Sequence, residues 1–291
     1  MIEVRSLEQL VAQLEEDRSL LERDHVHERL DALDRIDACF PHLASAVSDS
    51  ESSESQLSRR ASALRERLEA ANRDFYFAIR RDIQSGLRPD AFMRYLQPPL
   101  DRCDPRGLGY DALDELIGGV LQLDEPAAGH ISREPEKVFY QPTPARHIFS
   151  LMGLAELGTD DVLIDMGSGL GHVPVLVSIC THARCIGVEV EPVYVECARQ
   201  CAKRLNLNRV EFVRLDAREA DLSAGTVFYL YTPFTGSILR AVLDRLAHEA
   251  ATRGIRVCSY GPCTKAISKE PWLTAETATY PDRVALFRSR D

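Results

Sequence analysis

Three glycines at alternate positions follow a short apolar run near the middle of the chain, and together they define the first candidate binding site. The apolar run is Val162–Met166, a length typical of one buried strand. The glycines are Gly167, Gly169 and Gly171, and a predicted helix opens near His172. Glycine lets the backbone turn tightly and lets a ligand approach without a Cβ in the way. A helix that begins directly after such a turn directs unpaired N–H groups at that ligand.

Acidic residues lie beside this turn and at the ends of the next two predicted strands. Asp165 precedes the first glycine by two residues. Glu189 stands near the end of the strand predicted over Cys185–Val190, at an offset where a carboxylate can accept from both hydroxyls of a ribose. Asp216 follows the strand predicted over Val210–Leu215, where its carboxylate would accept from an adenine amino group.

A fourth predicted strand, Thr226–Tyr231, ends in Thr232, Pro233 and Phe234. Each of the four strands therefore carries a polar group at the same end, and helix-length segments separate three of them. Ligands of parallel sheets bind outside the carboxyl ends of the strands. The sequence therefore predicts a nucleoside site at that edge.

These segments resemble the first three motifs of the class I S-adenosylmethionine-dependent methyltransferases. The matching stretches are Asp165-x-Gly167-x-Gly169-x-Gly171, Gly187-Val-Glu189 and Asp216-Ala217. The resemblance covers roughly residues 137–291. Within this superfamily, about thirty residues from Asp165 onward are most similar to the non-SET histone-lysine methyltransferases.

The resemblance implies an α/β fold with a Rossmann-like, seven-stranded sheet that is mostly parallel and ends in an antiparallel hairpin. The hairpin would use Trp272–Ala275 and Val284–Phe287. It also implies S-adenosylmethionine as the cofactor and methyl transfer by in-line displacement. The residues expected to contact the cofactor are Tyr140, Thr143, Asp165, Gly167, Ser168, Gly169, Gly171, His172, Glu189, Val190, Asp216, Ala217 and Tyr231.

A Thr-Pro segment precedes the glycine-rich turn. The spacing predicts a helix in which Pro144 is the first residue and Thr143 the N-cap. The segment also resembles the Thr-Pro stretch that some amino-methyltransferases place over the methionine carboxylate, and a helix N-terminus is a suitable anion site. Capping alone and contact with the ligand both remain open, and the two roles are compatible. His172 is expected to line the pocket or to act as a base.

The residues just past the fourth strand face the methyl group in the enzymes that this chain resembles. Here Tyr231–Phe234 resembles the Asn-Pro-Pro-Phe motif of amino-methyltransferases in its last two positions only. Because Tyr231 and Thr232 replace the pair that holds a planar amine, the acceptor stays open among amines, carboxylates, hydroxyls and thiols, on a small molecule or a protein. We expect a partly apolar acceptor pocket between Tyr140 and Tyr231–Phe234, with Tyr140, Tyr231, Thr232 and Phe234 closest to the chemistry.

The N-terminal part reads as an accessory helical domain over residues 1–125, ahead of a methyltransferase domain over residues 126–291. Apolar residues at steps of four and three indicate a long amphipathic helix over about 57–85. The serine-rich segment 45–58 predicts a flexible connection, and 124–130 a domain boundary. We expect the long helix to pack within the chain and the helical domain to roof the acceptor pocket. A homodimer through these helices is the alternative.

Composition restricts the compartment and the partners. The net charge of −10 and a pI near 5.4 argue against general nucleic-acid binding, which needs a basic face. No apolar run approaches membrane-spanning length, and residues 1–6 lack a signal-peptide pattern. The eight cysteines lack paired C-x-x-C spacing, so we expect reduced thiols in a cytoplasmic protein, with zinc at Cys197 and Cys201 as the weaker alternative.

Two other classes of function compete with a methyltransferase. One is a helical scaffold that carries a degenerate methyltransferase fold. The intact glycines and acids argue against this alternative. The other is a nicotinamide-dependent dehydrogenase, whose fingerprint is Gly-x-Gly-x-x-Gly. It is disfavoured because Gly171 comes one residue too early.

Overall fold

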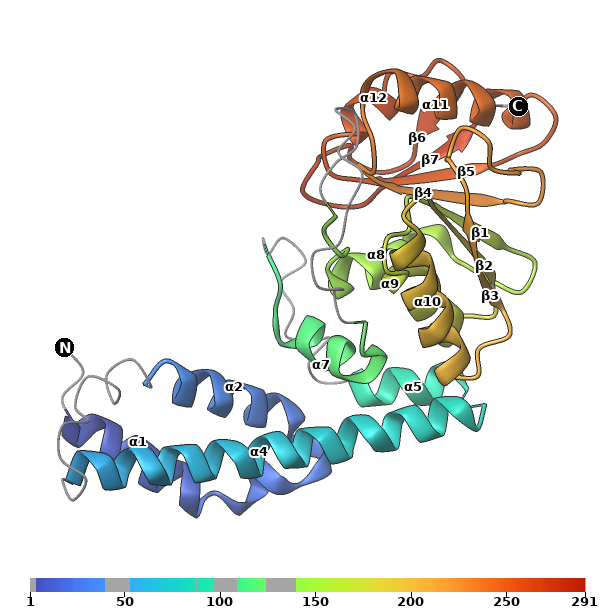
Figure 1. Ribbon diagram of the computed structural model, residues 1–291. Helices are drawn as coiled ribbons and strands as arrows, with labels where there is room; N and C mark the ends of the chain where they lie inside the picture. The colour runs from blue at the N-terminus through green and yellow to red at the C-terminus, as the bar shows by residue number, and fades with distance from the viewer. Residues whose placement is uncertain (1–3, 40–52, 87, 97–108, 124–139, 291) are drawn as a thin grey trace. The chain divides into compact units, whose positions relative to one another are not determined.

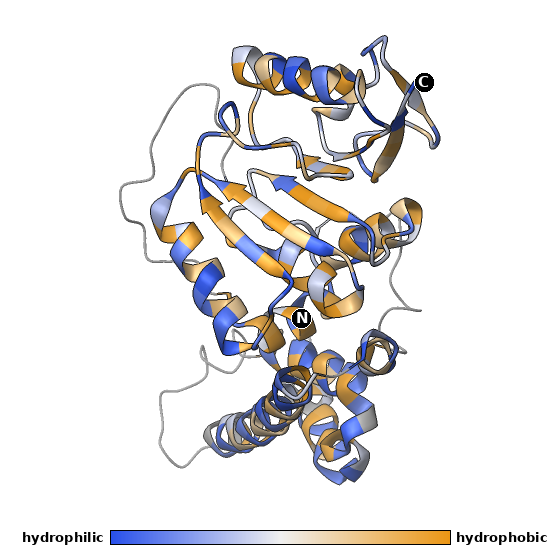
Figure 2. Ribbon diagram, turned by 90° about the vertical axis from the view of Figure 1, so that its right-hand side faces the viewer, coloured by the Kyte–Doolittle hydropathy of each residue, from blue (hydrophilic) through white to orange (hydrophobic). Residues whose placement is uncertain are grey.

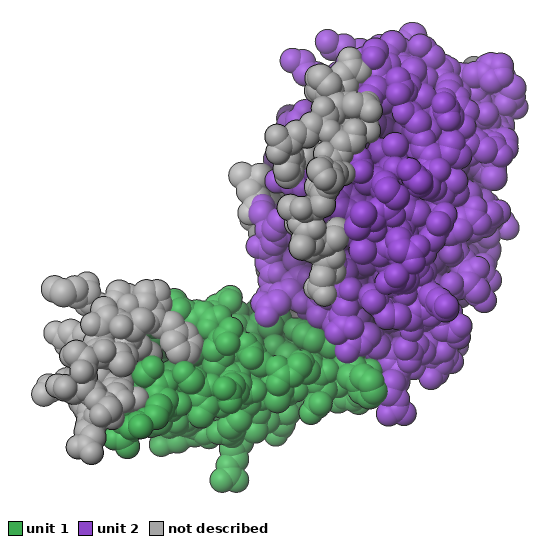
Figure 3. Space-filling view, in the orientation of Figure 1, with its two compact units in different colours: residues 1–79 green, residues 80–291 purple. Residues whose placement is uncertain are grey.

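A computed structural model describes residues 4–39, 53–86, 88–96, 109–123 and 140–290. The chain divides into two compact units, residues 1–79 and 80–291, which Figure 3 shows in different colours. The predicted boundary at 124–130 lies outside the described residues. The predicted flexible segment 45–58 lies partly outside them, and its described part, residues 53–58, is helical instead.

The described part of the first unit is largely helical, and its longer helices each bury an apolar face. Its elements are α1 (Val4–Glu16), the short helices η1 (Arg18–Leu21) and η2 (Arg23–His25), α2 (Val26–Asp37) and most of α4 (Ser53–Gln84). Leu57, Leu64 and Leu68 of α4 are almost fully buried. The long helix therefore forms where the apolar spacing predicts it, and Gly86, with φ of 83°, follows its end. Pairing of this helix with a second copy stays a prediction.

The division between the units lies inside α4, not at the predicted boundary of 125/126. Within the described residues, the helices α5 (Pro89–Leu96) and α7 (Ala112–Leu121) belong to the second unit. A hydrogen bond from Arg80 Nη1 to the Gly119 carbonyl (2.8 Å) links the end of α4 to α7. Cys201 Sγ donates to the Leu121 carbonyl at 3.4 Å. The helical residues after 79 thus pack with the α/β part of the chain.

The second unit is built around one seven-stranded sheet of order β3-β2-β1-β4-β5-β7-β6. Its elements after α7 are α8 (Ala145–Ala155), β1 (Val162–Met166), α9 (His172–Cys180), β2 (Arg184–Glu189), α10 (Pro192–Arg204), β3 (Val210–Arg214), β4 (Val227–Tyr231), α11 (Gly236–Ala250), β5 (Arg256–Tyr260), α12 (Thr264–Ile267), β6 (Leu273–Ala275) and β7 (Ala285–Ser289). β1 to β5 are parallel, and β7 is antiparallel to both β5 and β6. The predicted fold class is confirmed, including the terminal hairpin.

The strand order reverses direction at β1, which pairs with β2 on one side and β4 on the other. From β1 the chain runs outward through β2 to β3, whereas β4 leads to β5 in the opposite direction. Because such crossovers are right-handed, α9 and α10 cover one face of the sheet and α11 covers the other (Figure 1). The carboxyl ends of β1, β2 and β4 therefore meet at a switch point, where α/β sheets bind their ligands.

The core of the second unit is apolar because its central strands are buried on both faces. β1 is buried from Leu163 onward and β4 through Leu230, and Figure 2 shows the central strands as largely hydrophobic. On one face, the side chains of Ile164, Phe228 and Phe234 pack with α11. None of the helices in the described parts of the chain is both long and apolar enough for a membrane crossing.

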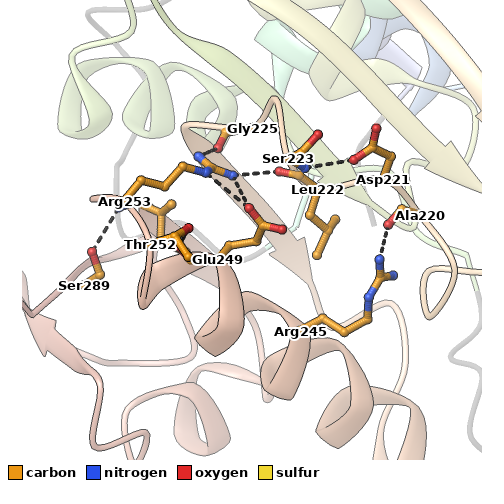
Figure 4. Close-up of polar contacts among 11 residues, drawn as sticks. Ala220, Asp221, Leu222, Ser223, Gly225, Arg245, Glu249, Thr252, Arg253 and Ser289 are labelled. Atoms are coloured by element: carbon orange, nitrogen blue, oxygen red, sulfur yellow. Dashed lines mark hydrogen bonds and ion pairs between the residues drawn. The ribbon is translucent and has the colours of Figure 1, made fainter.

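Arg245 of α11 and Arg253, three residues past the end of that helix, hold the segment that leads from β3 to β4 (Figure 4). Arg253 donates to the carbonyls of Gly225 and Leu222 and pairs with Glu249 at 2.9 Å. Arg245 donates to the carbonyls of residues 217, 218 and 220. These bonds satisfy main-chain groups of a segment without regular structure, and they fix where β4 enters the sheet beside β1.

Phe234→Ala should mainly destabilise the second unit, because this side chain is only 5% exposed and belongs to the apolar core. We expect the unfolding free energy to fall by about 3–5 kcal/mol. Denaturant unfolding is followed through Trp272, the one tryptophan, which packs against the same core. Tyr280→Ala removes a ring that is 57% exposed and should cost less than about 1 kcal/mol. Equal costs for the two variants would show that Phe234 is not a core residue.

Candidate functional site

The glycine-rich turn forms at the carboxyl end of β1 as predicted. Gly167, Gly169 and Gly171 all have left-handed backbones, with φ of 85°, 52° and 86°, which glycine adopts without steric cost. The N–H groups of Gly167 and Ser168 donate to the carbonyl of Val188 at 2.9 and 3.0 Å. The turn is thus bonded to β2, and α9 begins immediately after it.

Two segments distant in sequence lie directly on this turn. A Cβ placed on Gly169 would overlap the ring of Tyr140, and one on Gly167 would overlap the side chain of Pro233. Tyr140 precedes α8, and Pro233 follows β4. The structure therefore brings the predicted Tyr140 and the segment after β4 to the same turn.

The carboxylate of Glu189 holds the turn from the end of β2. Oε2 accepts from the N–H of Gly169 at 2.9 Å, and Oε1 accepts from the N–H groups of Val190 and Glu191 at 2.7 and 2.9 Å. The sequence predicts this residue as a ribose acceptor but not its bonds to the main chain. A carboxylate has roughly four acceptor positions. Roughly one therefore remains for a ligand hydroxyl, rather than the two that the sequence suggests.

Asp165 is a second buried carboxyl group beside the turn, and only 4% of it is exposed. Burial raises the pKa of Asp165 to about 8, and the negative charge of Glu189 contributes to that rise. In the strand register Asp165 lies opposite Gly187, two residues before Glu189. The two acids therefore make this edge of the sheet a site that favours positive charge.

Asp216 lies just after β3 as predicted, but its carboxylate is bonded to Arg218. Oδ1 accepts from the Arg218 N–H and Nε at 2.8 and 2.9 Å, and Oδ2 accepts from Nη2 at 2.7 Å. An adenine amino group would have to share this carboxylate with the guanidinium. Ala217, the next residue, is half-buried.

Thr143 is not the N-cap of α8, so that prediction is wrong. The helix begins at Ala145, and Pro144 stands at the N-cap with extended backbone angles and no side-chain cap. The carboxylate of Asp114 caps the helix instead, accepting from the Ala145 N–H at 2.7 Å. Thr143 Oγ1 lies 3.3 Å from the hydroxyl of Tyr229, and both residues are buried. An acid therefore already occupies the helix terminus that the sequence suggests as an anion site.

The predicted acceptor contacts of Thr232 and Phe234 are also wrong. Thr232 has a positive φ of 38°, and its buried hydroxyl donates to the Tyr260 carbonyl at 3.2 Å and accepts from the Cys263 N–H at 3.0 Å. Thr232 thus joins the ends of β4 and β5. Phe234 points into the core, where no acceptor can stack on it.

Three rings lie in sequence along the ends of β4, β5 and α8. Tyr231 lies 4.6 Å from Tyr260, which lies 4.2 Å from His147, measured between ring centroids. The Tyr231 hydroxyl donates to Gln141 Oε1 at 3.5 Å. Burial lowers the pKa of His147 to about 4, and its Nε2 has no hydrogen-bond partner within the described residues. Sequence reasoning missed Gln141, His147 and Tyr260, although Tyr260 ends the predicted fifth strand.

Tyr140 and His172 contact each other above the turn. The Tyr140 hydroxyl lies 3.0 Å from His172 Nδ1, and its ring lies 5.1 Å from that of Tyr194. Burial lowers the pKa of His172 to about 4 and raises that of Tyr140. His172 is therefore neutral at pH 7 and a weak base. Of the remaining predicted contacts, Val190 is half-buried, and the Ser168 hydroxyl is buried without a partner in the described chain.

No metal site is found among the described residues, where no group of three or more His, Cys, Asp or Glu side chains could hold an ion. Burial raises the pKa of the Cys201 thiol to about 11. Cys197 is half-buried.

No protein-family model matches the chain, and no curated protein matches its sequence. Among similar solved structures is an RNA methyltransferase from Salinibacter ruber in complex with S-adenosyl-L-homocysteine, at 27% identity, covering 51% of this chain and 92% of that one, with a TM-score of 0.42. A methyltransferase from Geobacter sulfurreducens is 16% identical, covering 52% of this chain and 82% of that one, with a TM-score of 0.41. An rRNA methylase from Streptococcus thermophilus is 13% identical, covering 53% of this chain and 99% of that one, with a TM-score of 0.36.

The order and direction of the strands decide the fold. The chain has the class I methyltransferase fold. The similar structures cover about half of the chain.

Asp165→Asn should change stability in a pH-dependent way. The folded pKa of about 8 lies above the ordinary value of 3.8, so the folded state keeps a proton that the unfolded state loses. Between these values this group makes the wild type less stable as pH rises, by up to about 1.4 kcal/mol per pH unit. We therefore expect the variant to gain stability relative to the wild type between pH 5 and pH 8.

Urea unfolding followed through Trp272 at both pH values measures this gain. Asp160→Asn makes the same substitution at an exposed position and serves as the control. A difference between Asp165→Asn and the wild type that is the same at pH 5 and pH 8 would contradict the raised pKa.

Proposed function

We propose that the chain is an S-adenosylmethionine-dependent methyltransferase. The observation that carries this proposal is the pair of buried acids, Asp165 and Glu189, beside a left-handed glycine turn at the switch point of the sheet. A glycine turn at this place fits several nucleotides. The Glu189 carboxylate and Asp165, a buried acid whose ionisation a cation would favour, suit a ligand that carries positive charge, as a sulfonium and an ammonium do. They disfavour the pyrophosphate of a dinucleotide.

The residues at the turn fit the parts of this cofactor. Its methionine part would lie beside the turn on which Tyr140 and Pro233 pack, and Asp165 would face its ammonium group. The remaining acceptor position of Glu189 would take a ribose hydroxyl. The adenine would lie near Ala217, with Asp216 shared between its amino group and Arg218.

When bound, the cofactor supplies an electrophilic methyl group on its sulfonium. The protein's contribution is to align acceptor, methyl and sulfur, an effect that can account for about 7–11 kcal/mol of the barrier. The groups at the turn fit a reaction driven by alignment. The phenol of Tyr140 has a raised pKa, and the neutral His172 is a weak base.

We place the acceptor between Tyr140 and Tyr231, next to Pro233. Tyr231 is half-buried, and its ring would form one wall of the pocket, backed by Tyr260. The amide of Gln141, at the Tyr231 hydroxyl, adds a polar group to that wall. A flat or aliphatic acceptor suits these walls. The nearer resemblance to histone-lysine methyltransferases finds no support in the similar structures, two of which are named as RNA or rRNA enzymes. The transfer assay below therefore includes RNA, protein and small molecules as methyl acceptors.

We also propose a cytoplasmic location. The seven cysteines in the described residues are all free thiols. Such thiols suit a reducing compartment.

Glu189→Gln should weaken binding of S-adenosylmethionine, because it removes a charge from the turn and weakens the bond to ribose. A charge-assisted hydrogen bond contributes about 1.5–3 kcal/mol, so we expect roughly a tenfold or larger rise in Kd. Titration calorimetry measures the affinity, and Trp272 fluorescence checks the fold. Glu196→Gln, on the exposed side of α10, is the matched control and should bind normally. The proposed function would be contradicted if the wild-type protein did not bind S-adenosylmethionine, or if NAD displaced it.

Tyr231→Ala should lower methyl transfer to the true acceptor about tenfold or more while Kd for the cofactor changes less than about twofold. The assay follows radiolabelled methyl groups from the cofactor into the RNA, protein and small-molecule fractions of a cell extract. Tyr280→Ala, an exposed ring, is the control. Equal losses of cofactor binding and transfer would place Tyr231 in the cofactor site alone.

A further inference from the structure

A cavity of about 430 Å³ lies within the first unit. Its volume falls within the range of roughly 300–1,000 Å³ that is usual for small-molecule sites. Arginines from three elements line it, namely Arg23 of η2, Arg29 of α2 and Arg67 of α4. Leu21 and Phe75 supply apolar walls, and among the lining residues Asp74 is the one acid.

Arg29 is a buried cation whose hydrogen-bond partners are neutral. Its side chain is only 1% exposed. Nε donates to Asn72 Oδ1 at 2.6 Å, and Nη1 donates to the carbonyls of Leu20 and Glu22 at 2.8 and 2.9 Å. Nη2 is buried and has no hydrogen-bond partner in the described parts of the chain. Burial lowers the pKa of this guanidinium, whereas the nearby charge of Glu28 opposes that change.

The two other arginines of the cavity are exposed and form no ion pair within the described residues. Other arginines of α4 are paired with acids of the same unit. Arg60 pairs with Glu15 at 2.6 Å, and Arg65 pairs with Asp37 at 2.7 Å. Although acids outnumber arginines over residues 1–55, three arginines and one aspartate leave the cavity lining with an excess of positive charge.

We propose that this cavity binds a small organic anion whose carboxylate or phosphate group faces Arg23, Arg29 and Arg67 and whose apolar part contacts Leu21 and Phe75. The guanidinium group suits this role because its planar fork of N–H donors matches both oxyanions. The buried charge of Arg29 would gain the anionic partner that its present hydrogen bonds do not provide. The proposal concerns the first unit alone and does not rest on the methyltransferase function.

The test is titration calorimetry of the full chain with hexanoate, hexyl phosphate, inorganic phosphate and neutral hexanol at one ionic strength. We expect both amphiphilic anions to bind more tightly than inorganic phosphate, and hexanol not to bind. Arg67→Gln should weaken binding of the amphiphilic anions roughly five- to tenfold, since one cationic contact is lost. Arg67 is exposed, so the variant should fold normally, which its thermal unfolding midpoint checks.

Arg73→Gln is the matched control, because it removes the same charge from an exposed position of α4 outside the cavity lining. It should bind the probes as the wild type does. Three outcomes would overturn the proposal. The first is that neither amphiphilic anion binds at about 10 mM, a concentration at which even a weak ligand would bind. The second is that hexanol binds as tightly as the amphiphilic anions. The third is that Arg67→Gln and Arg73→Gln weaken binding of the anions equally.

Discussion

The second unit depends on one carboxylate, that of Glu189 at the end of β2. It accepts from the N–H of Gly169 in the turn after β1 and from the two N–H groups that follow β2 itself. A left-handed turn leaves amide groups without partners in helix or strand, and buried amides need acceptors. One buried side chain meets this need for two neighbouring strand ends. The Val188 carbonyl, which accepts from Gly167 and Ser168, adds two more bonds from β2 to the same turn.

The same carboxylate sets the electrostatics of the site. Asp165 lies on the adjacent strand, and its raised pKa reflects burial first and the charge of Glu189 second. A site with two buried acids and no arginine bonded to either within the described residues favours cationic ligands. This property separates a sulfonium cofactor from a dinucleotide more directly than the spacing of the third glycine does.

Several polar residues in motif-like positions serve the protein's own main chain or pair with a neighbour instead of facing a ligand. Thr232 bonds the turn after β5, Asp114 caps α8, and Asp216 binds Arg218. The bonds of Thr232 meet the requirement that buried polar groups be hydrogen-bonded. Of the tetrapeptide Tyr231–Phe234, Tyr231 therefore remains for the acceptor wall that we propose, with Tyr260 behind it.

The strands, the glycine turn and the start of α9 can be predicted from the amino-acid order alone, because they follow from local properties. An apolar run of five residues predicts β1, and only glycine adopts three left-handed conformations in alternation without cost. Tertiary structure decided which partner each polar side chain has. Thr143 meets Tyr229, 86 residues away in sequence, and Arg29 meets Asn72, 43 residues away. No local periodicity encodes such pairs, because they exist only once separate elements pack together and bury the groups that must then be bonded.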